Sequence, residues 1–179
     1  TMFTENSPWR SLFGLLFWDI IYDTNVNAIH NPLQRSPSDF YKLDFYFKRK
    51  EQIHSRLNLC DNKEELLKIV SETYTQKAGT ANMLVSWYDD SLRKVTQLIH
   101  LLRTEQLKAI FLEMSQNLRE HTRGFPDLLI WDEQSFEFIE IKSPTDHLAA
   151  RQLHWLHFFE AHQIPSRIVR VKWIQTESE

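Results

Sequence analysis

The sequence is poor in glycine and cysteine. Its 179 residues include three glycines and one cysteine, although 42% are hydrophobic. So little glycine, beside much leucine, glutamine, glutamate and lysine, favours a helix-rich protein with few strands. The lone cysteine, Cys60, excludes an internal disulfide and is typical of a reducing, intracellular compartment. The length and apolar content suit one globular domain with a sizeable core.

Long apolar runs are also missing. The stretch over residues 12–21 is shorter than the roughly 18 apolar residues that a membrane-spanning helix needs, and it contains Asp19. The first residues lack the basic and apolar pattern of a secretory signal. We therefore expect no membrane association.

An excess of positive charge is the third absence. The formal net charge is −3, whereas domains that bind nucleic acids are usually basic. However, residues 42–56 and residues 142–172 each carry five lysines or arginines against two acids, a local charge of +3. Such clusters can bind phosphates while the total stays negative, although they can also be ordinary solvated faces. The candidates for phosphate contacts are Arg49, Lys50, Arg151 and Lys172.

The periodicity of apolar residues predicts helices along most of the chain. Ser7 and Pro8 are typical of a helix start, with serine as the N-cap and proline in the first turn. That helix should run to about residue 23. Further helices are predicted over residues 38–59, 63–76, 91–102, 104–120 and about 144–162.

Three short runs indicate strands. Residues 128–131 and 136–141 are strand-like, and the polar residues 132–135 between them predict a hairpin turn. Residues 168–173 form a third run, which follows a predicted helix and can therefore cross over to a parallel position. The order of elements predicts an α/β fold that is helix-rich.

The hairpin would bring two acids and a lysine together. The two-residue period of a strand places Glu140 and Lys142 on one face, and Asp127 enters the neighbouring strand. Two carboxylates form an oxygen-rich pocket for a divalent cation, and a nearby ammonium can act on an attacking water. This set therefore predicts metal-dependent phosphodiester cleavage. The alternative is a pair of exposed acids at strand ends, with a surface ion pair between Lys142 and Glu140.

Gln152 is a polar residue in an apolar stripe. On a helical wheel it falls in one sector with Leu148, Trp155 and Phe159, so its amide must be hydrogen-bonded to be stable there. We interpret it as an amide that holds Lys142, a water or a phosphate. A satisfied core glutamine is the alternative.

The histidines of the same helix do not predict a zinc site. His154 and His157 lie opposite the Leu148 stripe, and neither they nor His162 has HExxH spacing. We therefore interpret them as a solvated helix face.

Several motifs resemble known nucleases. Pro126-Asp127, followed by Glu140-Ile-Lys142, resembles the PD-(D/E)xK nuclease pattern, and the residues around it, Gly124 to Leu128 and Glu140 to Pro144, are similar to its VRR-NUC branch. Residues 5–19, 37–49 and 84–87 resemble the C-terminal nuclease domain of the Fanconi-associated nucleases. The resemblance thus runs along nearly the whole chain.

The resemblance implies the domain organisation. We expect a single domain over residues 1–179, with a restriction-endonuclease-like core from residues 1–23 and 104–175 and a helical insertion at about 24–103. In the related proteins such an insertion accompanies a monomer. A DNA-binding module and a helical-repeat region precede the domain in these relatives, so this chain looks like a C-terminal piece.

The resemblance also implies an activity and a full set of site residues. The expected activity is cleavage at 5′ flaps or branched DNA, with 5′-to-3′ exonuclease action, in interstrand-crosslink repair. The protein would be intracellular, in the nucleus if eukaryotic or in the cytoplasm if bacterial. The expected cofactor is Mg²⁺ or Mn²⁺, as two ions. The metal ligands would be Glu5, Asp127, Glu140 and the carbonyl of Ile141, and the catalytic residues would be Asp127, Glu140, Lys142 and Gln152.

The sequence allows two other functions. A degenerate nuclease fold could serve as a DNA- or protein-binding module, although all the expected acid and lysine positions are filled. A resolvase-like dimer could act on four-way junctions, although the helical insertion argues against it.

Overall fold

The structure, a computed structural model, describes residues 1–172. A short strand opens the chain and a series of helices follows it. These elements are β1 (Met2–Phe3), α1 (Ser7–Leu16), α2 (Trp18–Ile21), a 3-10 turn η1 (Thr24–Val26), α3 (Asp44–Leu59), α4 (Lys63–Lys77), α5 (Ser91–Leu101), α6 (Thr104–Gln116) and α7 (Leu118–His121). The remaining elements are β2 (Leu128–Trp131), β3 (Phe136–Lys142), α8 (Ala150–Ala161) and β4 (Ser166–Arg170).

The strands of the described residues form one mixed sheet in the order β1-β2-β3-β4. β1 and β2, like β2 and β3, are antiparallel, whereas β3 and β4 are parallel. The predicted hairpin and the predicted parallel strand are therefore confirmed. β4 begins at Ser166, earlier than expected, and the predicted strand end at Trp173 lies outside the described residues. β1 was not predicted, because two residues are too few for a periodic pattern.

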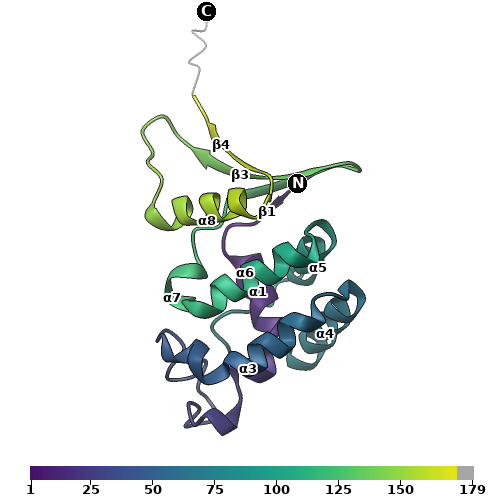
Figure 1. The fold of residues 1–179 in the computed structure, drawn as a ribbon, viewed down its shortest axis with the longest axis vertical. Coiled ribbons are helices and arrows are strands. Elements are labelled where there is room, and N and C mark those ends of the chain that lie inside the picture. Colours follow the sequence, from purple (N-terminus) through teal and green to yellow (C-terminus); the bar gives the residue numbers. More distant parts are fainter. Residues whose placement is uncertain (173–179) are drawn as a thin grey trace, which may run out of the picture.

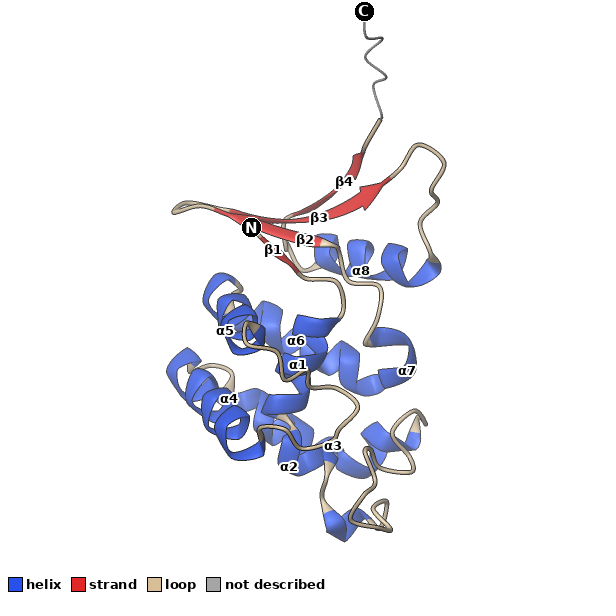
Figure 2. Cartoon of the chain, turned by 180° about the vertical axis from the view of Figure 1, so that it is seen from behind, coloured by secondary structure: helices blue, strands red, loops and turns tan. Residues whose placement is uncertain are grey.

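The sheet lies at one end of the molecule and the helices α1 to α7 lie at the other (Figure 1). Seen from either side, α8 packs on the face of the sheet that points toward this helical block (Figure 2). Aromatic side chains join the layers. Trp9 of α1 stacks on Phe125 with ring centroids 4.7 Å apart, and Phe125 stacks on Trp155 of α8 at 4.0 Å. The predicted α/β, helix-rich fold is confirmed.

Several helix boundaries differ from the prediction. The first helix breaks at Phe17 into α1 and α2, and Asn6 rather than Ser7 is its N-cap residue. The helix expected over residues 104–120 breaks at Asn117, whose side chain accepts a hydrogen bond from the backbone N–H of Glu120 and so caps α7. α8 begins at Ala150, because residues 144–149 form a loop after β3.

α3 begins at Asp44 rather than at residue 38, and its inward face includes Arg49. Arg49 shares that face with Phe45 and Ile53, and it is 1% exposed. Its Nη1 donates to Asp39 Oδ2 at 2.9 Å, and its Nε donates to the carbonyl of Ile20 at 3.0 Å. The prediction that Arg49 contacts DNA is therefore wrong. A count of local charges cannot detect that a charged residue falls at the spacing of the buried stripe.

The helices α3, α4 and α5 lie within the segment expected as an insertion, residues 24–103, although the limits of the domain and of the insertion stay a prediction. Within residues 1–172, no helix combines the length and apolar character that a membrane crossing requires.

Candidate active site

The register of the hairpin places Asp127 beside Glu140. Leu128 pairs with Ile139, so the next position of the same antiparallel register sets Asp127 opposite Glu140. The Asp127 carboxylate also accepts a hydrogen bond from the backbone N–H of Ile141, with Oδ2 and N 2.7 Å apart. This bond fixes the carboxylate at the end of β3.

Glu140, Lys142 and Gln152 form one hydrogen-bonded cluster under the sheet. Lys142 Nζ is 2.8 Å from Glu140 Oε1 and donates to Gln152 Oε1 at 2.9 Å. Gln152 Nε2 donates to the same Glu140 oxygen at 2.5 Å. Glu140 is 1% exposed and Lys142 is 8% exposed. The face shared by Glu140 and Lys142, and the bonded amide of Gln152, agree with the geometry that the sequence predicts.

Gln152 is itself held by the start of α8. Its Oε1 accepts a hydrogen bond from the backbone N–H of Ala149 at 3.0 Å, in addition to the bond from Lys142. The amide therefore caps the first turn of α8 and bridges the lysine and the glutamate. Its position depends on the fold rather than on a ligand, so the cluster is preorganised.

The second carboxylate oxygen of Glu140 is different. Oε2 is buried and has no hydrogen-bond partner among the described residues. Burial raises the pKa of Glu140; the hydrogen bond from Lys142 lowers it, whereas the charges of Asp127 and Glu5 raise it. A buried acceptor without a donor is rare in folded proteins. Because divalent cations such as Mg²⁺ take oxygen ligands, this oxygen and its neighbouring carboxylates fit a metal site.

Glu5 lies between β1 and α1, and its side chain is exposed. The residue before it, Thr4, is tied to the segment that carries Asp127, just before β2. Thr4 donates its backbone N–H to the carbonyl of Asp127 at 2.8 Å and its hydroxyl to the carbonyl of Pro126 at 2.9 Å. The N-terminal segment is thus anchored on the Asp127 side of the site, close enough for Glu5 to act electrostatically on Glu140.

Asn6 is a site-forming residue that the sequence analysis missed. Its side chain accepts a hydrogen bond from the backbone N–H of Gly124 at 2.7 Å and donates to Glu5 Oε1 at 3.2 Å. Its φ of 52° is one that few residues other than glycine adopt easily, and asparagine is among those few. An asparagine directly before a Ser-Pro helix start was the available signal.

Gly124 allows α8 to approach the site closely. Its φ is +88°, and a Cβ atom built there would lie 2.7 Å from the backbone carbonyl carbon of Arg151. Any other residue would therefore push α8, and Gln152 with it, away from Glu140.

The remaining candidates for DNA contacts lie on the surface. Lys50 and Lys172 are exposed. Arg151 is paired with Glu120, with Nε and Oε2 2.7 Å apart, and about two fifths of each side chain is exposed. Contacts of these three residues with DNA stay a prediction, as does the Ile141 carbonyl as a metal ligand.

His154 does not lie on a purely solvated face, so that interpretation is wrong for this residue. Its ring stacks on His121 with centroids 4.5 Å apart, and its Nε2 is 3.0 Å from Glu113 Oε1. Because the partners come from α6 and α7, the helical wheel of α8 could not reveal them. His157 is exposed, as the sequence analysis expects.

The VRR-NUC domain family matches residues 61–173. The chain belongs to this family. The matched segment includes Asp127, Glu140, Lys142 and Gln152, whereas Glu5 precedes it.

Similar proteins carry the name Fanconi-associated nuclease 1 or its homolog. The homolog of Caenorhabditis briggsae is 30% identical over 177 residues, which is 94% of this chain and 20% of that protein. The Danio rerio protein is 32% identical over 158 residues, or 85% of this chain and 16% of that protein. This VRR-NUC chain thus spans about a fifth or less of the length of these relatives.

A solved structure has the same fold. It is described as a crystal structure of paFAN1 bound to 1nt 5′ flap DNA with gap, and it is 27% identical in sequence with a TM-score of 0.88. The match covers 97% of this chain and 32% of the other. It supports the α/β, helix-rich fold across nearly the full length of the VRR-NUC chain.

Proposed function

We propose that this VRR-NUC chain is the catalytic domain of a structure-selective DNA nuclease, a hydrolase that cleaves phosphodiester bonds with the help of Mg²⁺ or Mn²⁺. The observation that supports it most is the buried Glu140 oxygen, which lacks a donor within the described residues and lies on the Asp127 side of the sheet. The names of the similar proteins support the same activity.

The carboxylates of Glu5, Asp127 and Glu140, with the carbonyl of Ile141, would hold the cation, in the proposed case two ions. All four are oxygen ligands, which Mg²⁺ and Mn²⁺ prefer. When bound, such ions supply an activated water and neutralise the charge that develops on the leaving oxygen.

Lys142 contributes a fixed positive charge. Its ammonium is bonded to Glu140 and Gln152, so it is oriented before any substrate binds. A preorganised donor of this kind can orient the attacking water and stabilise the negative charge that develops on the phosphate. Gln152 acts as a positioning residue, because it holds both Lys142 and Glu140.

The substrate would be a 5′-flap or branched DNA, cleaved near the flap and degraded in the 5′-to-3′ direction, in the repair of interstrand crosslinks. Support comes from the similar structure, which is described as bound to 5′ flap DNA. Lys50, Arg151 and Lys172 would contact the phosphates, Arg151 after release from Glu120. We further propose that the domain is a monomer in an intracellular setting, the nucleus of a eukaryote or the cytoplasm of a bacterium.

Cleavage of a labelled 5′-flap duplex tests the proposal. The chain should cleave it with Mg²⁺ or Mn²⁺ and not in EDTA, and Asp127→Ala should abolish cleavage. Glu133→Ala is the matched control, since it removes an exposed acid from the hairpin turn of the same strand pair. Unchanged cleavage by Asp127→Ala, or equal loss in both variants, would contradict the assignment.

A further inference from the structure

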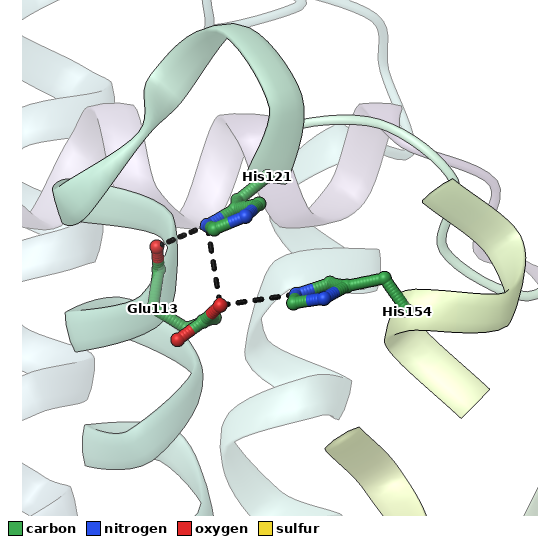
Figure 3. Close-up of side chains that lie close together, drawn as sticks. All are labelled: Glu113, His121 and His154. Carbon is green, nitrogen blue, oxygen red and sulfur yellow. Dashed lines mark hydrogen bonds and ion pairs between the residues drawn. The ribbon is translucent and has the colours of Figure 1, made fainter. Parts of the chain in front are cut away.

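A second cluster of ligand-type side chains lies where α6, α7 and α8 meet. Glu113 of α6, His121 of α7 and His154 of α8 point toward one another (Figure 3). Glu113 Oε1 is 3.3 Å from His121 Nδ1 and 3.0 Å from His154 Nε2. The three ligand atoms all lie within 4.8 Å of one another.

These spacings match a small tetrahedral ion. With metal–ligand bonds of about 2.0–2.1 Å, as in zinc sites, neighbouring ligand atoms of a tetrahedron lie roughly 3.3 Å apart. The two carboxylate–imidazole distances are already near that value.

The cluster is partly buried, and one of its ligand atoms has no hydrogen-bond partner. The side chains of Glu113 and His121 are 21% and 19% exposed, and that of His154 is 38% exposed. His154 Nε2 is fully buried but makes no hydrogen bond of acceptable geometry within residues 1–172. An imidazole nitrogen that is buried beside a carboxylate, without a proper partner, has an unused lone pair or an unused proton.

Binding needs a small rearrangement. The two imidazole rings are nearly parallel, at 9°, and each nitrogen lone pair lies in its own ring plane. One ring must therefore rotate about its Cβ–Cγ bond to share an ion with the other. His121 Nδ1 is also 2.8 Å from the backbone carbonyl of Glu113, and it must give up that contact. Both movements are side-chain rotations that leave the helices in place.

We propose that Glu113, His121 and His154 form a second metal site, which takes Zn²⁺ or a similar transition metal with a water as the fourth ligand. Two imidazoles and one carboxylate suit zinc, whereas the all-oxygen set around Glu140 suits Mg²⁺ or Mn²⁺. The site is separate from the proposed nuclease centre and does not depend on it.

The ion would fasten α8 to the helical block. α8 already contacts this region through the Arg151–Glu120 ion pair and through Trp155 Nε1, which donates to the carbonyl of Arg123 at 3.1 Å. The backbone framework is therefore preformed, which limits the cost of ordering on binding. Because α8 also carries Gln152, the ion would stabilise the helix that positions Lys142.

Co²⁺ titration followed by visible absorption tests the site. The protein should be untagged and should carry Asp127→Asn and Glu140→Gln, so that the oxygen-ligand site is removed. One equivalent of Co²⁺ should produce the absorption bands of a tetrahedral site, and one equivalent of Zn²⁺ should displace it. Binding should weaken at low pH, because protons compete for the imidazoles.

Three further substitutions in that background locate the ion. His154→Gln and His121→Gln each remove a direct ligand. Each should therefore weaken Co²⁺ and Zn²⁺ binding by more than the roughly tenfold that loss of an outer-shell partner costs. His157→Gln, which removes an exposed histidine from the same helix, should bind as the parent does. Far-UV circular dichroism checks that each variant is folded, and the two histidine variants serve as independent tests.

Thermal unfolding gives a second readout. Zinc at about 100 times its Kd should raise the Tm of the parent by roughly 5–10 °C, and the rise should disappear in His154→Gln. Absence of the cobalt bands, or equal binding by His154→Gln and His157→Gln, would overturn the proposal and leave an ordinary histidine–carboxylate contact. Neither result would contradict the proposed nuclease activity, because the two sites have separate ligands.

Discussion

Two buried charge clusters, one in the helical block and one under the sheet, differ in whether all their carboxylate oxygens accept hydrogen bonds. In the helical block, Arg49 donates to both carboxylate oxygens of Asp39, at 2.9 and 3.3 Å. Its guanidinium also lies over the ring of Phe45. Under the sheet, Glu140 has one oxygen that accepts two hydrogen bonds and one that accepts none from the described residues.

The difference separates a structural role from a binding role. A buried ion pair with all its groups bonded leaves nothing for a ligand, and its removal acts on stability. A buried carboxylate with a free oxygen and a raised pKa lacks groups that stabilise its ionised form. Ionisable groups with perturbed pKa values of this kind are typical of functional sites. We therefore expect substitutions in the two clusters to have opposite effects on activity and on stability.

Asp127→Asn should produce the largest change in activity. The amide keeps an oxygen for the N–H of Ile141 but removes a metal ligand, so cleavage should fall roughly 10³-fold or more. Initial rates on a flap duplex at saturating Mn²⁺ measure this. Cleavage within tenfold of the parent would remove Asp127 from the site.

The same variant should hold its stability in the absence of metal. Burial raises the pKa of Glu140 most, and the charge of Asp127 raises it further, so folding disfavours the ionised glutamate. A raised folded pKa gives a contribution that is complete below the unfolded pKa and is lost as the pH rises through the folded value. The Tm of Asp127→Asn relative to the parent should therefore be higher at pH 8 than at pH 5. A Tm difference that is the same at pH 5 and pH 8 would mean that the two carboxylates do not interact.

Arg49→Met should affect stability instead. The variant leaves Asp39 buried with Lys48 alone, whose Nζ is 3.7 Å from Oδ2. Loss of the bonded guanidinium should cost about 3–5 kcal/mol of unfolding free energy, measured by urea denaturation. In the double variant Arg49→Met with Asp39→Leu, much of that loss should be recovered, because an apolar pair has no unpaired charge. If Arg49→Met alone lowers the free energy of unfolding by less than about 1 kcal/mol, Arg49 is not buried in an ion pair.

Lys142→Ala should lower turnover by about 10²-fold at saturating metal while the Kd for Mn²⁺ changes only a few-fold. The ammonium is proposed to act on the water and the phosphate and not to bind the ion. Single-turnover rates and calorimetry on the same preparation separate the two quantities. Loss of Mn²⁺ affinity with normal turnover would mean that Lys142 supports metal binding and not the chemical step.

Lys50→Glu should have the smallest effect, a weaker affinity for duplex DNA and a log–log salt slope reduced by about 0.9 for one lost phosphate contact. Lys68→Glu makes the same change of charge at an exposed position of α4 and is the control. Equal slopes in the two variants would make Lys50 an ordinary surface residue and direct attention to Arg151 and Lys172.

The sequence predicts the chemistry of the sheet better than that of the helical block. A two-residue period is short and regular, so the shared face of Glu140 and Lys142 and the hairpin that brings Asp127 to them follow from local spacing. The hydrogen-bonded amide of Gln152 could be predicted because Gln152 is a polar residue in an otherwise apolar stripe. The role of Glu5 rests on resemblance alone. The position of Glu5 depends on hydrogen bonds that join Thr4 and Asn6 to the loop before β2, more than a hundred residues later.

The errors of prediction have a common cause. Arg49 depends on Asp39 and Ile20, and His154 depends on Glu113 and His121, partners that no local pattern identifies. When only its own helix is considered, a charged or imidazole side chain such as Arg49 or His154 is predicted to be solvent-exposed. The contacts that change this conclusion come from outside the helix concerned. Asp39 lies in the loop before α3 and Ile20 lies in α2, whereas Glu113 and His121 lie in α6 and α7.

Isothermal titration with Mn²⁺ tests most directly whether the free carboxylate oxygen under the sheet marks a metal site. The titration uses His154→Gln protein, so that the proposed site at α6–α8 cannot contribute. This protein should bind Mn²⁺. The double variant His154→Gln with Asp127→Asn should not bind it, whereas the double variant His154→Gln with Glu133→Ala should bind it unchanged. No binding by the His154→Gln protein, or binding that survives Asp127→Asn, would contradict the account.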